Sequence, residues 1–149
     1  MKSFVGGWRT FSAPSPAAPA EVYAVDASGT VRQLTHQNDA WLKEVDVAPT
    51  VRTSFKSRDG TEVHGFLVTP PNAKPGLRLP TMLFNHGGPQ SQLPAAFSMD
   101  WQIYAGHGYA VAASNFRGGT GRGQAYSSAI YANGGRSMFR MLWAAWTMQ

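Results

Sequence analysis

The chain has 149 residues and a formal net charge of +5, with 43% hydrophobic and 14% charged residues. This length and apolar content are enough for one domain with a core of its own. The absence of cysteine excludes disulfides, thiolate catalysis and cysteine-ligated metal from this sequence. The 16 glycines and 10 prolines indicate many turns without low complexity.

Neither a membrane span nor an export signal is visible in the sequence. No apolar run approaches the length needed to cross a bilayer, so we expect no membrane partner. Residues 1–9 lack the apolar core of a signal peptide, which slightly favours the cytoplasm and otherwise leaves the compartment unknown. A missing upstream segment could carry such a signal.

The first part of the chain predicts a short β hairpin after a linker. Residues 11–20 form a Pro/Ala/Ser stretch, which predicts an extended or linker-like segment. Residues 21–25 and 30–34 have strand composition, and residues 26–29 supply the turn between them. Residues 36–48 are expected to form a polar connection.

A second hairpin follows, and its signal is stronger. Residues 51–57 alternate, residues 58–61 turn, and residues 62–69 return. The Asp59-Gly60 pair between two β-rich runs is a strong hairpin signal. The proline-rich residues 70–76 then end the pattern.

The remainder predicts alternating strands and helices. We expect a central strand buried on both faces over 81–85, a helix over 95–107 and a strand over 109–114. A glycine-rich loop at 115–123 and a helix at 124–132 complete the pattern. This order predicts an α/β fold with an antiparallel start and parallel strands. The strands before residue 48 are assigned to a separate β domain.

The first candidate site directly follows the predicted strand 81–85. His86-Gly87-Gly88-Pro89 is an HGG-type motif, and in α/β-hydrolases the backbone N–H of such a loop contributes to an oxyanion hole. Glycine lets the backbone turn its N–H groups toward a ligand. The alternative is a plain strand-to-helix turn that needs glycine for its dihedral angles.

A nucleophile for such a hole is not found, so no catalytic residue is assigned. Gly-x-Ser-x-Gly does not occur, and no Asp or His follows Ser114 in the sequence. Five serines were considered and lack the strand-elbow-helix context: Ser91, Ser98, Ser114, Ser127 and Ser128.

The histidines predict neither a metal site nor a cofactor site. His36, His64, His86 and His107 have no metal-ligand spacing. We interpret His64 and His107 as structural or surface residues, and His86 as a residue that orients its loop.

The glycine-rich loop at 115–123 has three possible interpretations. It lacks the Gly-Lys-Ser/Thr ending of a phosphate loop. Its Arg-Gly-Gly segment is also found in RNA-binding proteins, and the chain has no acidic residue after Asp100. The favoured interpretation is a tight structural loop that Asn115 and Arg117 hold by hydrogen bonds.

Taken together, five segments closely resemble the prolyl oligopeptidase family of serine peptidases, above all its acylaminoacyl-peptidase and dipeptidyl-peptidase-like members. The resemblance covers residues 18–132. Its segments are Asp59-Gly60 with Val63 to Pro70, Phe84 to Pro89, Trp101-Gln102, Gly108 to Val111, and Asn115 to Gly121.

The resemblance implies a β-propeller followed by an α/β-hydrolase domain that cleaves short peptides with a Ser-Asp-His triad. His86, Gly87 and Gly88 match the oxyanion loop, while the triad lies beyond the matching residues. The implied domains are the propeller end and linker at 1–48, the start of the hydrolase domain at 49–132, and an aberrant tail at 133–149. The implied partner is a short peptide, with no cofactor, metal, nucleic acid or membrane; the oligomeric state is unknown.

The tail at 133–149 resembles nothing in the family, and its codons suggest a reason. Met and Trp each have a single codon, so the DNA sequence at these positions is known. In a reading frame whose codons begin on the last base of the codons as read, the codon that starts in Met138 must encode Val, and the one that starts in Trp143 must encode Gly. With G or C at free positions the shifted text reads about Val-Asp-Val-Gln-Asp-Val-Val-Gly-Gly-Val-Asp-Asp-Ala, an acidic helix like the one before the family's nucleophile strand. We therefore hypothesise a frameshift near residues 133–136; the alternative is a genuine divergent helix.

The sequence thus predicts a fragment of a serine peptidase that is inactive by itself. The alternatives are a non-catalytic hydrolase-like domain and a basic Arg/Gly module that binds nucleic acid.

Overall fold

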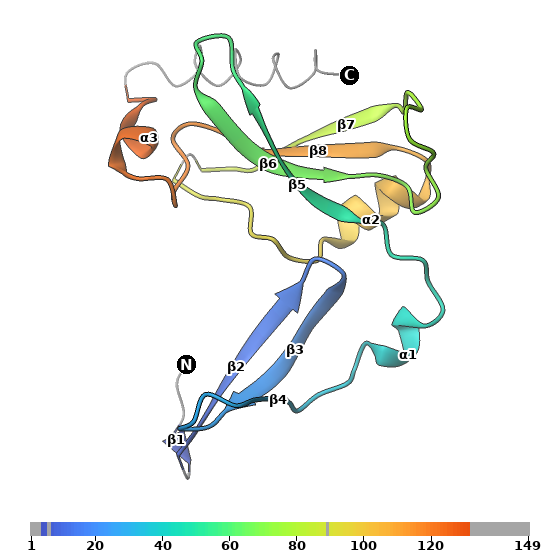
Figure 1. Ribbon diagram of the computed structural model, residues 1–149, viewed down its shortest axis with the longest axis vertical. Coiled ribbons are helices and arrows are strands. Elements are labelled where there is room, and N and C mark those ends of the chain that lie inside the picture. Colours follow the sequence, from blue (N-terminus) through green and yellow to red (C-terminus); the bar gives the residue numbers. More distant parts are fainter. Residues whose placement is uncertain (1–3, 6, 89, 132–149) are drawn as a thin grey trace. The chain divides into compact units, whose positions relative to one another are not determined.

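The computed structural model describes residues 4–5, 7–88 and 90–131 (Figure 1). The chain divides into two compact units. The first unit is Met1–Val47 with Ala96–Met99, and the second is Ala48–Ala95 with Asp100–Gln149. The predicted aberrant tail at 133–149 lies outside the described residues. No helix in the described part of the chain is long and apolar enough to span a membrane.

The first unit is built on an antiparallel sheet with the strand order β1-β2-β3-β4. Its strands are β1 (Phe4–Val5), β2 (Trp8–Ser15), β3 (Ala18–Val25) and β4 (Val31–Gln33). The predicted hairpin is confirmed as β3 and β4, which pair from Tyr23↔Gln33 to Val25↔Val31.

Residues 11–20 are extended, but the linker interpretation is wrong, because most of these residues belong to β2 and β3. The two strands pair from Arg9↔Val25 onward, and the register shifts between Ala13 and Ser15. Pro14 lies at this irregularity, where a residue without an N–H is tolerated in a sheet. Local composition therefore misled the prediction, and strand pairing decided the structure.

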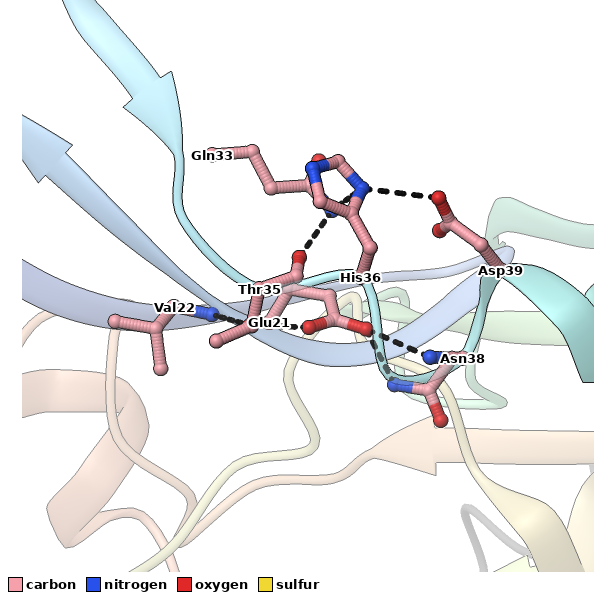
Figure 2. Close-up of polar contacts among 7 residues, drawn as sticks. All are labelled: Glu21, Val22, Gln33, Thr35, His36, Asn38 and Asp39. Carbon is pink, nitrogen blue, oxygen red and sulfur yellow. Dashed lines mark hydrogen bonds and ion pairs between the residues drawn. The ribbon is translucent and has the colours of Figure 1, made fainter.

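A buried carboxylate connects β3 to the segment that follows β4. Glu21 is 5% exposed, and its carboxylate accepts hydrogen bonds from the Thr35 hydroxyl, the Asn38 N–H at 2.9 Å and the Asn38 side-chain amide at 2.8 Å (Figure 2). The Thr35 bond, then the Asn38 N–H, lowers the pKa of Glu21 to about 2. The connection predicted over 36–48 also contains a short helix, α1 (Asp39–Leu42).

The second unit contains a mixed sheet with the strand order β5-β6-β8-β7. Its strands are β5 (Thr50–Lys56), β6 (Glu62–Val68), β7 (Thr81–Asn85) and β8 (Ala110–Asn115). β5, β6 and β8 pair antiparallel, and β7 lies parallel to β8. The predicted α/β fold with an antiparallel hairpin followed by parallel strands is confirmed. β7, however, was expected to be central, and among the described strands it lies at the end of the sheet and is half-buried.

Helix α2 (Met99–Gly106) covers one face of this sheet. Trp101 and Ala105 pack there against buried side chains of β6 and β8, namely Phe66, Val68, Val111 and Ala113. The helix begins four residues later than predicted. Phe97 belongs to the first unit instead, where its ring meets the edge of Trp41 at 5.9 Å. A contact distant in sequence has therefore overridden the helical spacing.

Candidate functional site

Two loops leave the same edge of the second sheet. β7 and β8 are parallel, so the loop after Asn85 and the loop after Asn115 both begin at carboxyl ends of strands (Figure 1). In open α/β sheets, ligands bind outside these carboxyl ends. The predicted oxyanion motif therefore lies at the edge where chemistry is expected.

The two glycines of the motif present their backbone to solvent. Gly87 and Gly88 are exposed, and Gly88 has a φ of 142°, a conformation that favours glycine. A Cβ at Gly87 would meet no atom within 4 Å. Neither N–H donates a hydrogen bond to another described residue. Both donors are thus available to an incoming oxygen atom.

The position of His86 is fixed by contacts between its imidazole ring and other residues of the chain. The imidazole stacks on Phe116 with ring centroids 4.4 Å apart and an interplanar angle of 10°. Its Nδ1 lies 2.8 Å from the carbonyl oxygen of Gly87, and its Nε2 is buried with no hydrogen-bond partner among the described residues. This environment fits a residue that orients the loop, whereas a general base needs an accessible nitrogen.

Asn115 joins the two loops through its side-chain amide. Its Oδ1 accepts the Leu93 N–H at 2.7 Å, and its Nδ2 donates to the Leu93 carbonyl at 3.2 Å. Asn115 is 9% exposed, so both bonds form away from bulk solvent. Leu93 belongs to the irregular segment between β7 and α2 that carries the motif. The amide therefore replaces the strand pairing that this segment lacks.

The glycine-rich loop adds a second connection. The Thr120 N–H donates to the Ser91 carbonyl at 3.0 Å. A Cβ at Gly119 would lie 2.8 Å from the same oxygen, so only glycine fits this close approach. The Ser127 hydroxyl of α3 (Gln124–Ser128) donates to the Gly119 carbonyl at 2.8 Å. The helix predicted over 124–132 is thus shorter than expected in its described part.

Arg117 connects the loop to the turn of the β5–β6 hairpin. Its guanidinium lies 2.5 Å from the Asp59 carboxylate, and its side chain is 16% exposed. Hydrogen bonds, first from the Ser57 hydroxyl and also from Arg117, hold the pKa of Asp59 below its usual range. The prediction that Asn115 and Arg117 hold the loop is confirmed, although both partners lie outside the loop. A paired Arg117 next to buried Gly118 and Gly119 gives no support to the nucleic-acid alternative.

His107, His64 and Ser128 have partners close in the sequence. His107 Nδ1 lies 2.8 Å from the Ile103 carbonyl, and His64 lies 3.7 Å from Glu62, as expected for structural or surface residues. The Ser128 hydroxyl bonds the Gln124 carbonyl. In the described part of the chain no group of three or more His, Asp or Glu could hold a metal ion.

A groove of about 500 Å³ lies elsewhere on the second unit. Backbone and side chains of all four strands line it, together with the segment 76–79, and residues 86–88 do not. Gly65, Leu67 and Ala112 line it, and they alternate along β6 and β8 with Phe66 and Ala113. Phe66 and Ala113 also line it, and they belong to the core under α2. Because residues 86–88 do not line this groove, the candidate site is placed at the two loops.

Sequence reasoning found the motif but missed the contacts that hold it. Leu93 and Ser91 carry no signal, because they act through backbone groups. Asn115 was singled out, yet its partner 22 positions earlier could not be read from spacing.

The comparisons with known proteins show which family the chain resembles. The sequence profile described as Prolyl oligopeptidase family matches residues 95–148, a range that includes most of the tail set apart above. The uncharacterized peptidase YuxL of Bacillus subtilis is 30% identical over 119 residues, covering 80% of this chain and 18% of its own. Dipeptidyl-peptidase 5 of Aspergillus fumigatus is 29% identical over 121 residues, covering 79% and 17%.

A solved structure shows the same fold. The acylaminoacyl peptidase of Pyrococcus horikoshii superposes with a TM-score of 0.82 at 27% identity, covering 97% of this chain and 24% of its own. The chain therefore spans about a fifth of the length of the curated relatives it matches.

Proposed function

The chain belongs to the prolyl oligopeptidase family of serine peptidases, and we propose that it carries the oxyanion loop of such a peptidase in His86, Gly87 and Gly88. The observation that carries this proposal is that the N–H groups of Gly87 and Gly88, at the carboxyl ends of β7 and β8, donate to no other described residue. A tetrahedral intermediate needs donors that are already in place before charge develops on its oxygen.

The substrate of the whole protein is a short peptide. The relatives are named as dipeptidyl-peptidases, and one similar structure is an acylaminoacyl peptidase in complex with Z-Gly-Gly-Phe-chloromethyl ketone. In the proposed reaction a serine attacks the scissile carbonyl, a histidine accepts its proton, and an aspartate orients the histidine. The loop then stabilises the oxyanion, and loss of one such donor typically lowers kcat by about 10²–10³-fold.

The 149-residue polypeptide itself is expected to have no turnover. It contains no Gly-x-Ser-x-Gly, and the described Ser127 and Ser128 hydroxyls donate to backbone carbonyls. Without a Ser-His pair, only the residual effects of binding and oxyanion stabilisation remain.

The test is peptide hydrolysis by the protein expressed from the complete reading frame that contains this segment. We expect cleavage of short chromogenic peptides, and a kcat that falls at least tenfold when Gly88→Pro removes one donor. Gly76→Pro, in a turn distant from the motif in sequence, is the control for introducing proline. A folded protein without peptidase activity would refute the proposal.

The frameshift remains a separate prediction, tested by sequencing the gene. We expect the adjacent frame after residues 133–136 to continue into Gly-x-Ser-x-Gly. The family profile matches residues 95–148 in the frame as read, so this match weighs against the frameshift, and the gene sequence decides between the two. An adjacent frame with early stop codons and no such motif would eliminate the hypothesis.

A further inference from the structure

The segment between β7 and α2 contains the proposed oxyanion donors but has no regular structure of its own. The described residues of this segment, 86–88 and 90–98, form neither helix nor strand. Donors in an oxyanion hole must be held within a few tenths of an ångström of their working position. Other parts of the chain must therefore supply the rigidity.

The polar contacts that residues 90, 91 and 93 make with other described parts of the chain come from one stretch, residues 115–131, while the side chains of Leu93 and Ala95 also pack against the hydrophobic core. The Asn115 amide binds the backbone of Leu93 at both ends, and the Thr120 N–H binds the Ser91 carbonyl. The Phe116 ring lies under His86, and the Tyr131 hydroxyl accepts from Gln90 at 2.9 Å.

Of these contacts, the one made by the Asn115 side-chain amide consists of two hydrogen bonds, one accepted and one donated. Its oxygen accepts from the Leu93 N–H and its nitrogen donates to the Leu93 carbonyl, so the backbone is fixed on both sides of the Leu93 Cα. Because Asn115 is the last residue of β8 and is buried, its own position is set by the sheet. Rigidity of the sheet thus passes to the loop through this amide.

We propose that Asn115 is a positioning residue that holds the oxyanion loop through Leu93. This inference rests on the proposed function, since it concerns the same loop. Asn115 does not touch the substrate; it acts by fixing where the N–H groups of Gly87 and Gly88 point.

The chain offers a matched control. Gln102 makes the same two-bond contact elsewhere: its Oε1 accepts the Ala48 N–H at 2.7 Å, and its Nε2 donates to the Ala48 carbonyl at 3.2 Å. Asn115→Ala and Gln102→Ala therefore remove the same chemistry, and only the first touches the loop.

The first experiment measures kinetics in the protein from the complete reading frame. Asn115→Ala is expected to lower kcat about tenfold to a hundredfold with KM within about twofold, because the loop acts in the transition state. Gln102→Ala is expected to leave kcat within about twofold. Asn115→Asp keeps the shape and the acceptor for the Leu93 N–H, and it is expected to recover part of kcat.

Equal losses of kcat in Asn115→Ala and Gln102→Ala would overturn the inference, because the effect would then be general destabilisation. So would a wild-type kcat in folded Asn115→Ala. If Asn115→Ala does not fold, Asn115→Asp provides the test. A wild-type kcat in Asn115→Asp would overturn the inference, and so would a failure of Asn115→Asp to fold while Gln102→Ala folds.

The second experiment, amide hydrogen exchange, does not depend on activity. Asn115→Ala is expected to speed exchange at Leu93 and also at Thr120, whose bond to Ser91 the substitution does not touch directly. Faster exchange at Leu93 with unchanged Thr120 would contradict the inference, since the loop would not have moved. A wild-type protein that shows no peptidase activity would refute the proposed function, and the exchange result would still decide the role of Asn115.

Discussion

A buried polar contact in the first unit and two in the second differ in kind. In the first unit a buried carboxylate, Glu21, collects donors from Thr35 and Asn38. In the second, the neutral side-chain amides of Asn115 and Gln102 each bind the N–H and the C=O of a single residue. A carboxylate contact depends on pH, whereas an amide contact does not. The Asn115 contact of the candidate site is therefore not expected to change with acid, whereas the Arg117–Asp59 contact of the same loop is.

The largest expected effect is on the stability of the second unit. It tests whether this unit depends on apolar packing as well as on its amide hydrogen bonds. Phe116 is 2% exposed, packs with Val63 and stacks on His86. Phe116→Ala is expected to destabilise the second unit by about 3–5 kcal/mol. Hydrogen exchange should rise across residues 50–131 and stay unchanged in β2 and β3.

The control is Phe11→Ala in the first unit, where the ring is 41% exposed and stacks on Tyr23. We expect a smaller loss there, limited to the first unit. Equal exchange changes in both units for Phe116→Ala would show that they do not unfold separately.

The next effect concerns the close approach of the two loops. A methyl group at Gly119 would lie 2.8 Å from the Ser91 carbonyl and 3.0 Å from the Phe116 carbonyl, both backbone atoms. Gly119→Ala is expected to cost about 1–3 kcal/mol, measured by urea denaturation. Gly106→Ala has open space around the new methyl group and is expected to cost nothing. Equal midpoints for the two variants would mean that the loops do not meet as described.

Much of this arrangement follows from the sequence, and the exceptions have a common cause. The Asp59-Gly60 hairpin and the strands at 81–85 and 110–115 were predictable because their signals are local. The strand at 11–15 and the late start of α2 were not, because pairing and the Phe97–Trp41 contact depend on residues distant in sequence. Within the candidate site, the glycines identified the motif in the sequence, whereas the Asn115–Leu93 contact could be recognised only in the folded structure.

A pH titration separates the two kinds of contact directly. The pKa of Glu21 is lowered from 4.5 to about 2 in the folded unit, first by the Thr35 hydroxyl. Because the folded pKa lies below the unfolded value, the stabilisation is present above about pH 4.5 and is lost as the pH falls toward 2. Guanidinium midpoints for the first unit should follow this decline, and Glu21→Gln should remove it. A decline that persists in Glu21→Gln would assign it to other groups.

The smallest expected effect is at the hairpin turn of the second unit. Asp59 pairs with Arg117 but its side chain is 48% exposed, so Asp59→Asn is expected to cost no more than about 1 kcal/mol. Its pKa is held below the usual range, so this contribution also disappears as the pH falls. Asp26→Asn, at the equivalent turn of the first unit, is the matched variant. The cost of Asp59→Asn should shrink in high salt, and an undiminished cost would point to the turn hydrogen bonds instead.

The central claim is that this chain carries an oxyanion loop without the serine that the loop would serve. The most direct measurement is covalent labelling by a fluorophosphonate, which reacts with activated serines. We predict no labelling of the 149-residue polypeptide, and labelling of the protein from the complete reading frame at the serine of a Gly-x-Ser-x-Gly motif. Labelling of any serine within the 149 residues would contradict the account.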